Sequence, residues 1–279
     1  MRIDSHQHFW KFDPKRQDWI TKSMKPIRQD FLPEDLKPHL DSFQLDACVA
    51  VQAEESNSET EFLLDLAEQN EWISAVVGWM DLADPDLDQK LEQYQPKIKL
   101  KGFREVLQSK EPHYFLRKEF IQGLKTLHKK GYSYDLLLYY HQLPAIFEMI
   151  KKVGEQRLVI DHLAKPPIQS GRWKEWRKSL KPLAERDYIY CKLSGMVTEA
   201  NWEDWSYEDL LPYMEISLEL FGPERLLFGS DWPVCLLAGE YEQVYGVIEN
   251  FTDSLSTDEK GLIFGKSAQE FYQIKSPKS

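Results

Sequence analysis

Residues 158–167 read LVIDHLAKPP, an apolar run that breaks into polar side chains where a β-strand would end. Such a run is typical of a strand buried on both faces of a parallel sheet. Seven more short runs, rich in β-branched or aromatic residues, recur along the chain. Together the expected strands cover residues 2–8, 47–53, 73–79, 100–106, 133–139, 158–162, 188–194 and 226–230.

Helical periodicity fills the stretches between these strands, with apolar residues three or four positions apart. The expected helices include residues 59–70, 115–130, 143–153, 174–186 and 208–221, and two more at 241–251 and 257–272. Eight strands alternating with helices predict a (β/α)8 TIM barrel, an α/β fold, closed and capped by the two C-terminal helices. A doubly wound open sheet shares the local pattern, but the chain has no Gly-rich phosphate loop. With no linker or repeat, residues 1–279 are expected to form one domain.

The amino-acid composition limits the classes of molecule that this protein can bind. The net charge is −11, and no stretch of the chain concentrates Lys and Arg, which excludes a nucleic-acid or anionic-membrane partner. Neither a signal peptide nor a membrane-spanning run is visible, so a cytoplasmic location is expected. A small-molecule substrate and homo-oligomeric assembly remain compatible with these features. The three cysteines, Cys48, Cys191 and Cys235, lie in or beside apolar stretches and are expected to be buried thiols.

The first strand ends in His6 and His8, two residues apart. Side chains alternate along a strand, so both imidazoles project to the same side. At the carboxyl end of a barrel strand they face the mouth, where a pair of neutral imidazoles can begin a Zn²⁺ site. Two hydrogen-bonded histidines near a chain end would give the same pattern, and the motif alone does not decide between them.

Two more polar residues follow strands at the same edge. His162 ends the sixth strand, and Asp231 follows the eighth. Because a barrel closes on itself, the eighth strand lies beside the first, and Asp231 becomes a neighbour of His6 and His8. Each residue alone could be a helix cap or a satisfied core histidine. Three separate strands ending in ligand or acid/base side chains are harder to explain by packing.

Cationic side chains also occupy strand ends. Lys101 and Arg104 lie on the fourth strand, Lys165 follows the sixth, and Lys192 lies on the seventh. Inward-facing cations suggest a substrate with a carbonyl, a carboxylate or several hydroxyls. Internal ion pairs with Glu54, Glu55 or Asp161 are the equal alternative.

Aromatic residues near the strand ends are candidate pocket walls, since flat rings suit the apolar faces of sugars. These are Trp10, Trp79, Tyr140 and Trp232, each of which could equally serve the core. His141 follows the fifth strand as a candidate ligand, acid/base group or substrate contact. It precedes an expected helix, so a capping role is equally compatible.

Three motifs carry a resemblance to a known family: HQHFW at residues 6–10, VIDHLAKP at 159–166 and LLFGSDWP at 226–233. With these motifs in this order, the chain resembles the amidohydrolase superfamily, and within it the branch of sugar-lactone and related lactone hydrolases. The resemblance runs nearly end to end.

The resemblance implies a core site of His6, His8, His162 and Asp231, all four as metal ligands. Lys101 precedes the place where many amidohydrolases carry a metal-bridging lysine, so one divalent ion at most is expected, with zinc favoured. Some lactonases of this branch are able to work without metal, which leaves the requirement open. The resemblance also implies that Arg104, Lys165 and Lys192 bind the carbonyl or the substrate.

The resulting hypothesis is hydrolysis of a sugar-acid lactone. Asp231 accepts a proton from the attacking water, and His162 holds the ion or protonates the departing alkoxide. A metal-dependent decarboxylase of an unsaturated acid is the rival enzyme. A non-catalytic barrel that binds sugar acids is the rival of another class.

Overall fold

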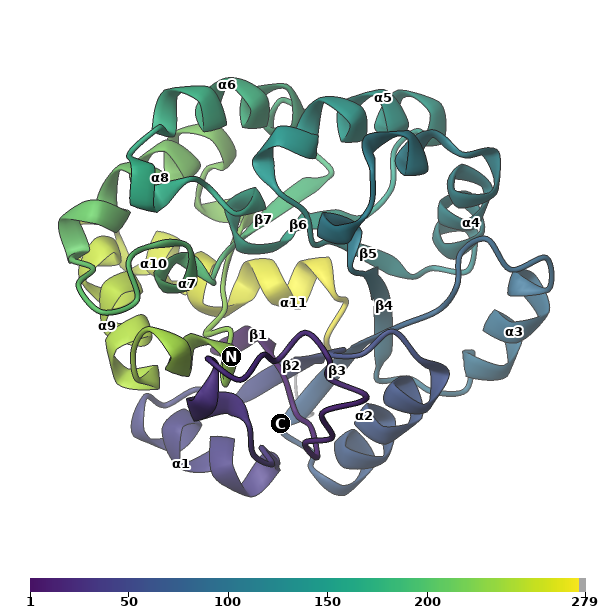
Figure 1. The fold of residues 1–279 in the computed structure, drawn as a ribbon, viewed down its shortest axis with the longest axis horizontal. Helices are drawn as coiled ribbons and strands as arrows, with labels where there is room; N and C mark the ends of the chain where they lie inside the picture. The colour runs from purple at the N-terminus through teal and green to yellow at the C-terminus, as the bar shows by residue number, and fades with distance from the viewer. Residues whose placement is uncertain (276–279) are drawn as a thin grey trace.

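The computed structural model describes residues 1–275 and contains one parallel sheet. Its strands follow one another in chain order around the sheet (Figure 1). They are β1 (Ile3–Gln7), β2 (Ala47–Val51), β3 (Ile73–Gly78), β4 (Leu100–Glu105), β5 (Ser133–Leu136), β6 (Leu158–Ile160), β7 (Ile189–Leu193) and β8 (Leu226–Phe228). Every strand expected from the sequence is present, and most are shorter at their carboxyl ends.

Backbone hydrogen bonds close the sheet into a barrel. The N–H of Asp231 donates to the carbonyl of His6 at 2.8 Å, and the N–H of His8 donates to the carbonyl of Trp232 at 2.7 Å. These bonds join the end of β1 to the segment that follows β8, so closure is made on the very residues expected to carry chemistry. The predicted TIM barrel is confirmed.

The helices surround the strands as an outer ring, except for the last one, which crosses the barrel outline (Figure 1). They are α1 (Pro33–Ser42), α2 (Asn57–Gln69), α3 (Leu87–Tyr94), α4 (Lys118–Lys129), α5 (Leu143–Val153), α6 (Trp173–Ala184), α7 (Met196–Glu199), α8 (Tyr207–Phe221), α9 (Tyr241–Thr252), α10 (Thr257–Gly261) and α11 (Ser267–Phe271). No helix among residues 1–275 is long and apolar enough to cross a membrane.

The expected helix over residues 257–272 is interrupted. A π-helical turn, Leu262–Lys266, separates α10 from α11. The reason is a close approach to the amino terminus, since a Cβ on Gly265 would collide with the carbonyl oxygen of Met1. The turn lets the chain pass this point and redirects α11.

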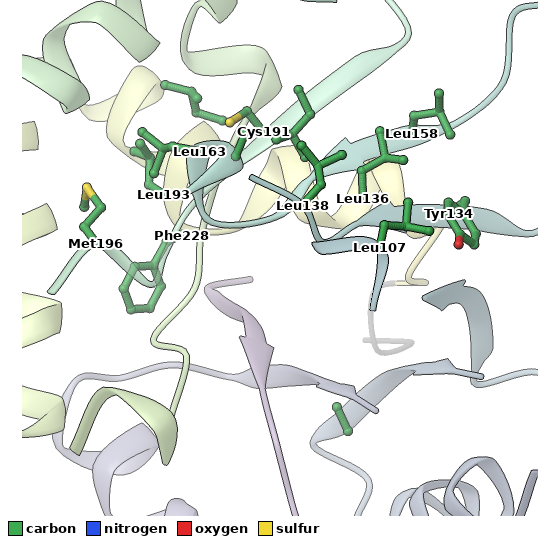
Figure 2. Packing of buried hydrophobic residues seen from close by; sticks show 14 of the residues in the cluster. Leu107, Tyr134, Leu136, Leu138, Leu158, Leu163, Cys191, Leu193, Met196 and Phe228 are labelled. Carbon is green, nitrogen blue, oxygen red and sulfur yellow. The ribbon is translucent and has the colours of Figure 1, made fainter. Parts of the chain in front are cut away.

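Apolar packing forms two layers. The larger cluster lies between strands and helices, and Figure 2 shows part of it, including Leu136, Leu158 and Phe228. The second cluster joins inward residues of the strands to side chains of α11 and the residues just after it. In Figure 1, α11 crosses the middle of the barrel outline. The C-terminal helix therefore fills one end of the barrel and leaves the other end for the site.

All three cysteines are fully buried free thiols, as expected.

Candidate active site

His6 of β1 and His8, which directly follows β1, face each other because the strand is irregular. Ile3 packs in the inner cluster, and strict alternation would then point His6 outward. The pairing of β1 with β2 shifts register between Asp4 and Gln7, which turns His6 inward. Its Nε2 lies 3.2 Å from Nε2 of His8. Nδ1 of His8 lies 2.8 Å from the carbonyl oxygen of Val51, which can only accept, so Nε2 of His8 keeps its lone pair for the site.

His162 and Asp231 are held in a left-handed backbone conformation, with φ of 51° and 57°. The left-handed run continues through Lys165. Such conformations are rare outside glycine and persist only where packing enforces them, commonly at functional sites. Nδ1 of His162 lies 2.8 Å from Oγ of Ser194, which directly follows the neighbouring strand β7, and this contact fixes the ring.

One carboxylate oxygen of Asp231 lies at the centre of the three imidazoles. Its Oδ1 is 3.4 Å from Nε2 of His8, 3.7 Å from Nε2 of His6 and 3.8 Å from Nε2 of His162. Each of the four residues is 4% exposed or less, so the groups meet in a nearly dry pocket. The hydrogen-bonded or capping roles left open for these residues do not account for this convergence.

Burial sets the protonation of these groups. Desolvation lowers the pKa of His162 to about 4 and holds the pKa of His6 well below its usual value. Burial by itself raises the pKa of Asp231, but the neighbouring imidazoles, His162 first, outweigh it and hold that pKa below its ordinary range. At neutral pH the imidazoles of His6 and His162 are therefore neutral, and Asp231 is a carboxylate.

This donor set fits a divalent cation. One ligand atom each from His6, His8 and Asp231 lies within 4.8 Å of the others. Two neutral imidazole nitrogens and a carboxylate oxygen are the ligands of catalytic Zn²⁺ sites that keep an open position. A second grouping of His6, Asp161 and His162 is also close enough, but Asp161 is already engaged by two cations.

A buried ion network lies beneath His6. Nζ of Lys192 lies 2.6 Å from Oδ2 of Asp135, 2.9 Å from Oδ1 of Asp161 and 2.9 Å from Nδ1 of His6. Nη1 of Arg104 donates to Oδ2 of Asp161 at 3.0 Å. The ion-pair alternative for Lys192 and Arg104 is thus correct.

The sequence interpretation did not include Asp135. A signal was present, because Asp135 is the one carboxylate of its strand and stands between Tyr134 and Leu136, both of which are buried.

A cavity of about 720 Å³ opens above the four groups. Its lining includes His8, His162 and Asp231 on the floor, and Arg104 beside them. Lys165 lines it too, with Nζ 3.0 Å from Oε1 of Glu199. The predicted residues of separate strands therefore share one cavity at the carboxyl ends of the barrel.

The aromatic wall differs from the expected one. The rings that line the cavity are Trp19, Tyr139 and Trp202, which lie in loops. Trp10 is buried behind Trp19, with ring centroids 5.9 Å apart. Loops carry no periodic signal, so no sequence pattern distinguished these rings from other aromatic residues.

Several predicted substrate contacts do not reach the cavity lining. Trp232 packs in the core against Phe31, and Trp79 lies against the start of α2 through backbone bonds to Thr60. His141 is exposed and stacks on Tyr139. Trp10, Tyr140 and the deeply buried Lys192 do not line the cavity either. For all of these residues a substrate-binding role stays a prediction, and their positions do not favour that role.

Lys101 lies elsewhere. It lines a cavity near the amino ends of the strands and has no place at the four-residue site. This position agrees with the expectation that Lys101 does not fill the place of a metal-bridging lysine.

Known proteins similar to this chain include lactonases and amidohydrolases. An L-fucono-1,5-lactonase from Burkholderia multivorans is 38% identical over 289 residues, covering 99% of this chain and 97% of the relative. An L-rhamnono-gamma-lactonase from Scheffersomyces stipitis is 29% identical over 203 residues, covering 63% of this chain and 59% of that protein.

A solved structure extends the similarity to three dimensions. The crystal structure of an amidohydrolase from Burkholderia multivorans with bound zinc matches with a TM-score of 0.96 at 37% identity, covering 99% of this chain and 100% of the other. The family described as Amidohydrolase matches residues 3–274. The chain therefore belongs to the amidohydrolase family.

Proposed function

We propose that this protein hydrolyses a sugar-acid lactone, of the L-fucono- or L-rhamnono-lactone type, to the open hydroxy acid. The observation that carries the proposal is the convergence of three imidazoles on the Asp231 carboxylate, with His8, His162 and Asp231 lining one cavity and His6 buried beside them. Full-length similarity to an L-fucono-1,5-lactonase supports the substrate class.

Asp231 serves as the general base. Water adds to the lactone carbonyl carbon while its proton passes to the carboxylate of Asp231. The tetrahedral intermediate then expels the ring oxygen, which takes a proton and becomes the hydroxyl of the product. We propose that the proton which Asp231 took from water reaches that oxygen through His162, whose Nε2 lies 3.8 Å from Oδ1 of Asp231.

His6, His8 and Asp231 would hold a divalent ion, and we propose zinc, with His162 as a further ligand if it is not the acid. When bound, such an ion polarises the carbonyl and stabilises the developing oxyanion. Nη1 of Arg104 lies 3.3 Å from Nε2 of His6 and adds positive charge at the same place.

The cavity suits a polyhydroxylated ring. Arg104 and Lys165 provide donors, and Glu54 and Glu199 provide acceptors around the lining. The rings of Trp19, Tyr139 and Trp202 offer flat surfaces for the C–H faces of a sugar. A location in the cytoplasm and homo-oligomeric assembly stay predictions.

Replacing Asp231 tests the proposal. We expect Asp231→Asn to lower kcat at least about a thousandfold, because an amide cannot accept the proton. Turnover would be followed with a pH indicator on fucono-, rhamnono- and galactonolactones. Asp253→Asn, a change at an exposed carboxylate, is the control and should keep full activity. Undiminished turnover by Asp231→Asn would end the proposed role.

Measuring the bound metal tests the proposed divalent-ion site. Elemental analysis of the purified protein should find about one divalent ion per chain. His6→Ala and His8→Ala should each reduce the bound metal, because each removes one nitrogen ligand. Wild-type metal content in both variants would exclude this site.

The same measurements separate the rival functions. A decarboxylase releases CO2 from an unsaturated acid and does not open lactones. A binding barrel would show a saturating thermal shift with a lactone and no turnover. No feature of the site favours either.

A further inference from the structure

A second cavity, of about 500 Å³, lies at the amino ends of the strands, opposite the active site. Lys99 and Lys101 at the start of β4 line it, as do Gly131 and Tyr132 before β5, and Arg157 before β6. Lys275, which follows the helix that fills this end of the barrel, also lines the cavity.

Positive charge gathers around this cavity. Its lining cations are Lys97, Lys99, Lys101, Lys130, Arg157 and Lys275, whereas Glu71 is the one carboxylate among the described lining residues. The whole chain carries a net charge of −11, so this face departs sharply from the average surface. The expectation that no stretch of the chain concentrates Lys and Arg did not reveal this cluster, because the fold gathers residues spread over more than 170 positions.

Four of these cations have no carboxylate partner within residues 1–275. Lys99 donates to the backbone carbonyls of Ala67 and Asn70. Arg157 donates to those of Phe271 and Gly131. The side chains of Lys101 and Lys275 make no ion pair or hydrogen bond within that part of the chain. By contrast, Lys97 pairs with Glu68, and Lys130 pairs with Asp88 and Glu92.

The unpaired cations destabilise one another. Burial lowers the pKa of Lys101, and the charges of Lys275 and Arg157 lower it further. Burial also lowers the pKa of Lys99 and of Arg157. Half-buried cations without carboxylate partners are expected to bind an anion, because it is costly to remove a charge from water without giving it a partner.

We propose that this cavity binds a small anion with two or more negative charges, of the phosphate type, through Lys99, Lys101, Arg157 and Lys275. Gln95 and the Tyr132 hydroxyl are further polar groups of the lining. The carboxylates that pair with Lys97 and Lys130 lie around the cavity and oppose a long polyanion such as a nucleic acid. The bound anion links β4, the segments before β5 and β6, and the C-terminal end of the chain, and so stabilises the barrel.

Calorimetric titration of the whole protein with inorganic phosphate and with pyrophosphate tests this site, in buffer held at constant ionic strength with NaCl. We expect saturable binding, tighter for pyrophosphate, and a thermal midpoint that rises with its concentration. The double variant Lys101→Gln, Lys275→Gln should bind at least about tenfold more weakly, since two charge-assisted contacts are lost.

Two controls locate the binding. Lys178→Gln, at an exposed lysine of α6, should bind like wild type. Lys165→Gln removes a cation of the active-site cavity and should also leave the affinity unchanged. The proposal is overturned if no saturable heat is seen, if the double variant binds as tightly as wild type, or if Lys165→Gln abolishes binding. None of these results depends on lactone turnover.

Discussion

Individual residues at the site are fixed by close contacts as well as by hydrogen bonds. Gly195 has φ of 60°, and a Cβ there would lie 2.5 Å from Nδ1 of His162. Gly229 is equally constrained, because a Cβ would lie 2.7 Å from Cβ of His6. Glycine at these two positions is what lets both imidazoles occupy their places.

Gly195→Ala should therefore lower kcat by about tenfold or more, since small displacements of a catalytic group are costly. Gly171→Ala is the matched control. Gly171 has φ of 65°, but a Cβ there would meet no atom within 4 Å, so only backbone strain of about 1–2 kcal/mol is added. Steady-state kinetics and thermal unfolding of both variants separate the effects. Equal kcat in the two variants would contradict the positioning role of Gly195.

At the level of helices and strands, the connection from β2 to α2 shapes one rim of the active-site cavity. Ser56 caps α2 by accepting from the N–H of Glu59. The Glu59 side chain turns back, and its Oε1 accepts from the N–H of Ala53 at 2.9 Å. This buried carboxyl holds the loop that carries Glu54 and Glu55 to the cavity lining.

Glu59 should make stability depend on pH. Burial raises its pKa to about 7 from an ordinary value of 4.5. The folded state therefore holds the proton more tightly than the unfolded chain. The contribution to stability is full below pH 4.5 and is lost as pH rises through about 7.

Glu59→Gln should remove this pH-dependent loss of stability. The free energy of unfolding of the variant should therefore fall less than that of the wild type between pH 4.5 and 8. Urea unfolding across this range measures the difference. Asp65→Asn, at an exposed position of the same helix, should follow the wild-type profile. Parallel profiles for wild type and Glu59→Gln would refute the assignment.

In the barrel as a whole, the two ends have different roles. Chemistry lies at the carboxyl ends of the strands, whereas α11 fills the amino ends. Phe271 of α11 is 1% exposed and packs on Tyr190, with ring centroids 5.0 Å apart. Function and stability are therefore expected to separate along the barrel axis.

Phe271→Ala should lower the unfolding free energy by about 3–5 kcal/mol through the cavity that it creates, with KM unchanged. Trp202→Ala, at the mouth of the active-site cavity, should do the reverse, raising KM with little change in Tm, because Trp202 is 37% exposed. A rise in KM for Phe271→Ala at unchanged Tm would contradict this division.

Much of the fold was predictable because its signals are local. Apolar runs of strand length predicted every strand, and the polar residues that end the first, sixth and eighth strands predicted the site. Closure of the barrel then followed from strand count, and it placed Asp231 beside His6 and His8 as expected. The expected helix at residues 257–272 failed only where Gly265 meets the amino terminus.

The order of residues along the chain was enough to specify the barrel and the strand ends that carry the four groups, because the succession of strands is a property of the chain. Alternation predicted that His6 and His8 share one side, and the register shift in β1 decided that His6 faces inward. Packing in three dimensions was needed to set the partners: Asp135 for Lys192, the rings that wall the cavity, and the meeting of Lys101 with Arg157 and Lys275. These contacts join residues far apart in the chain through loops and helix ends. Their geometry depends on how entire elements pack against one another, which no local pattern encodes.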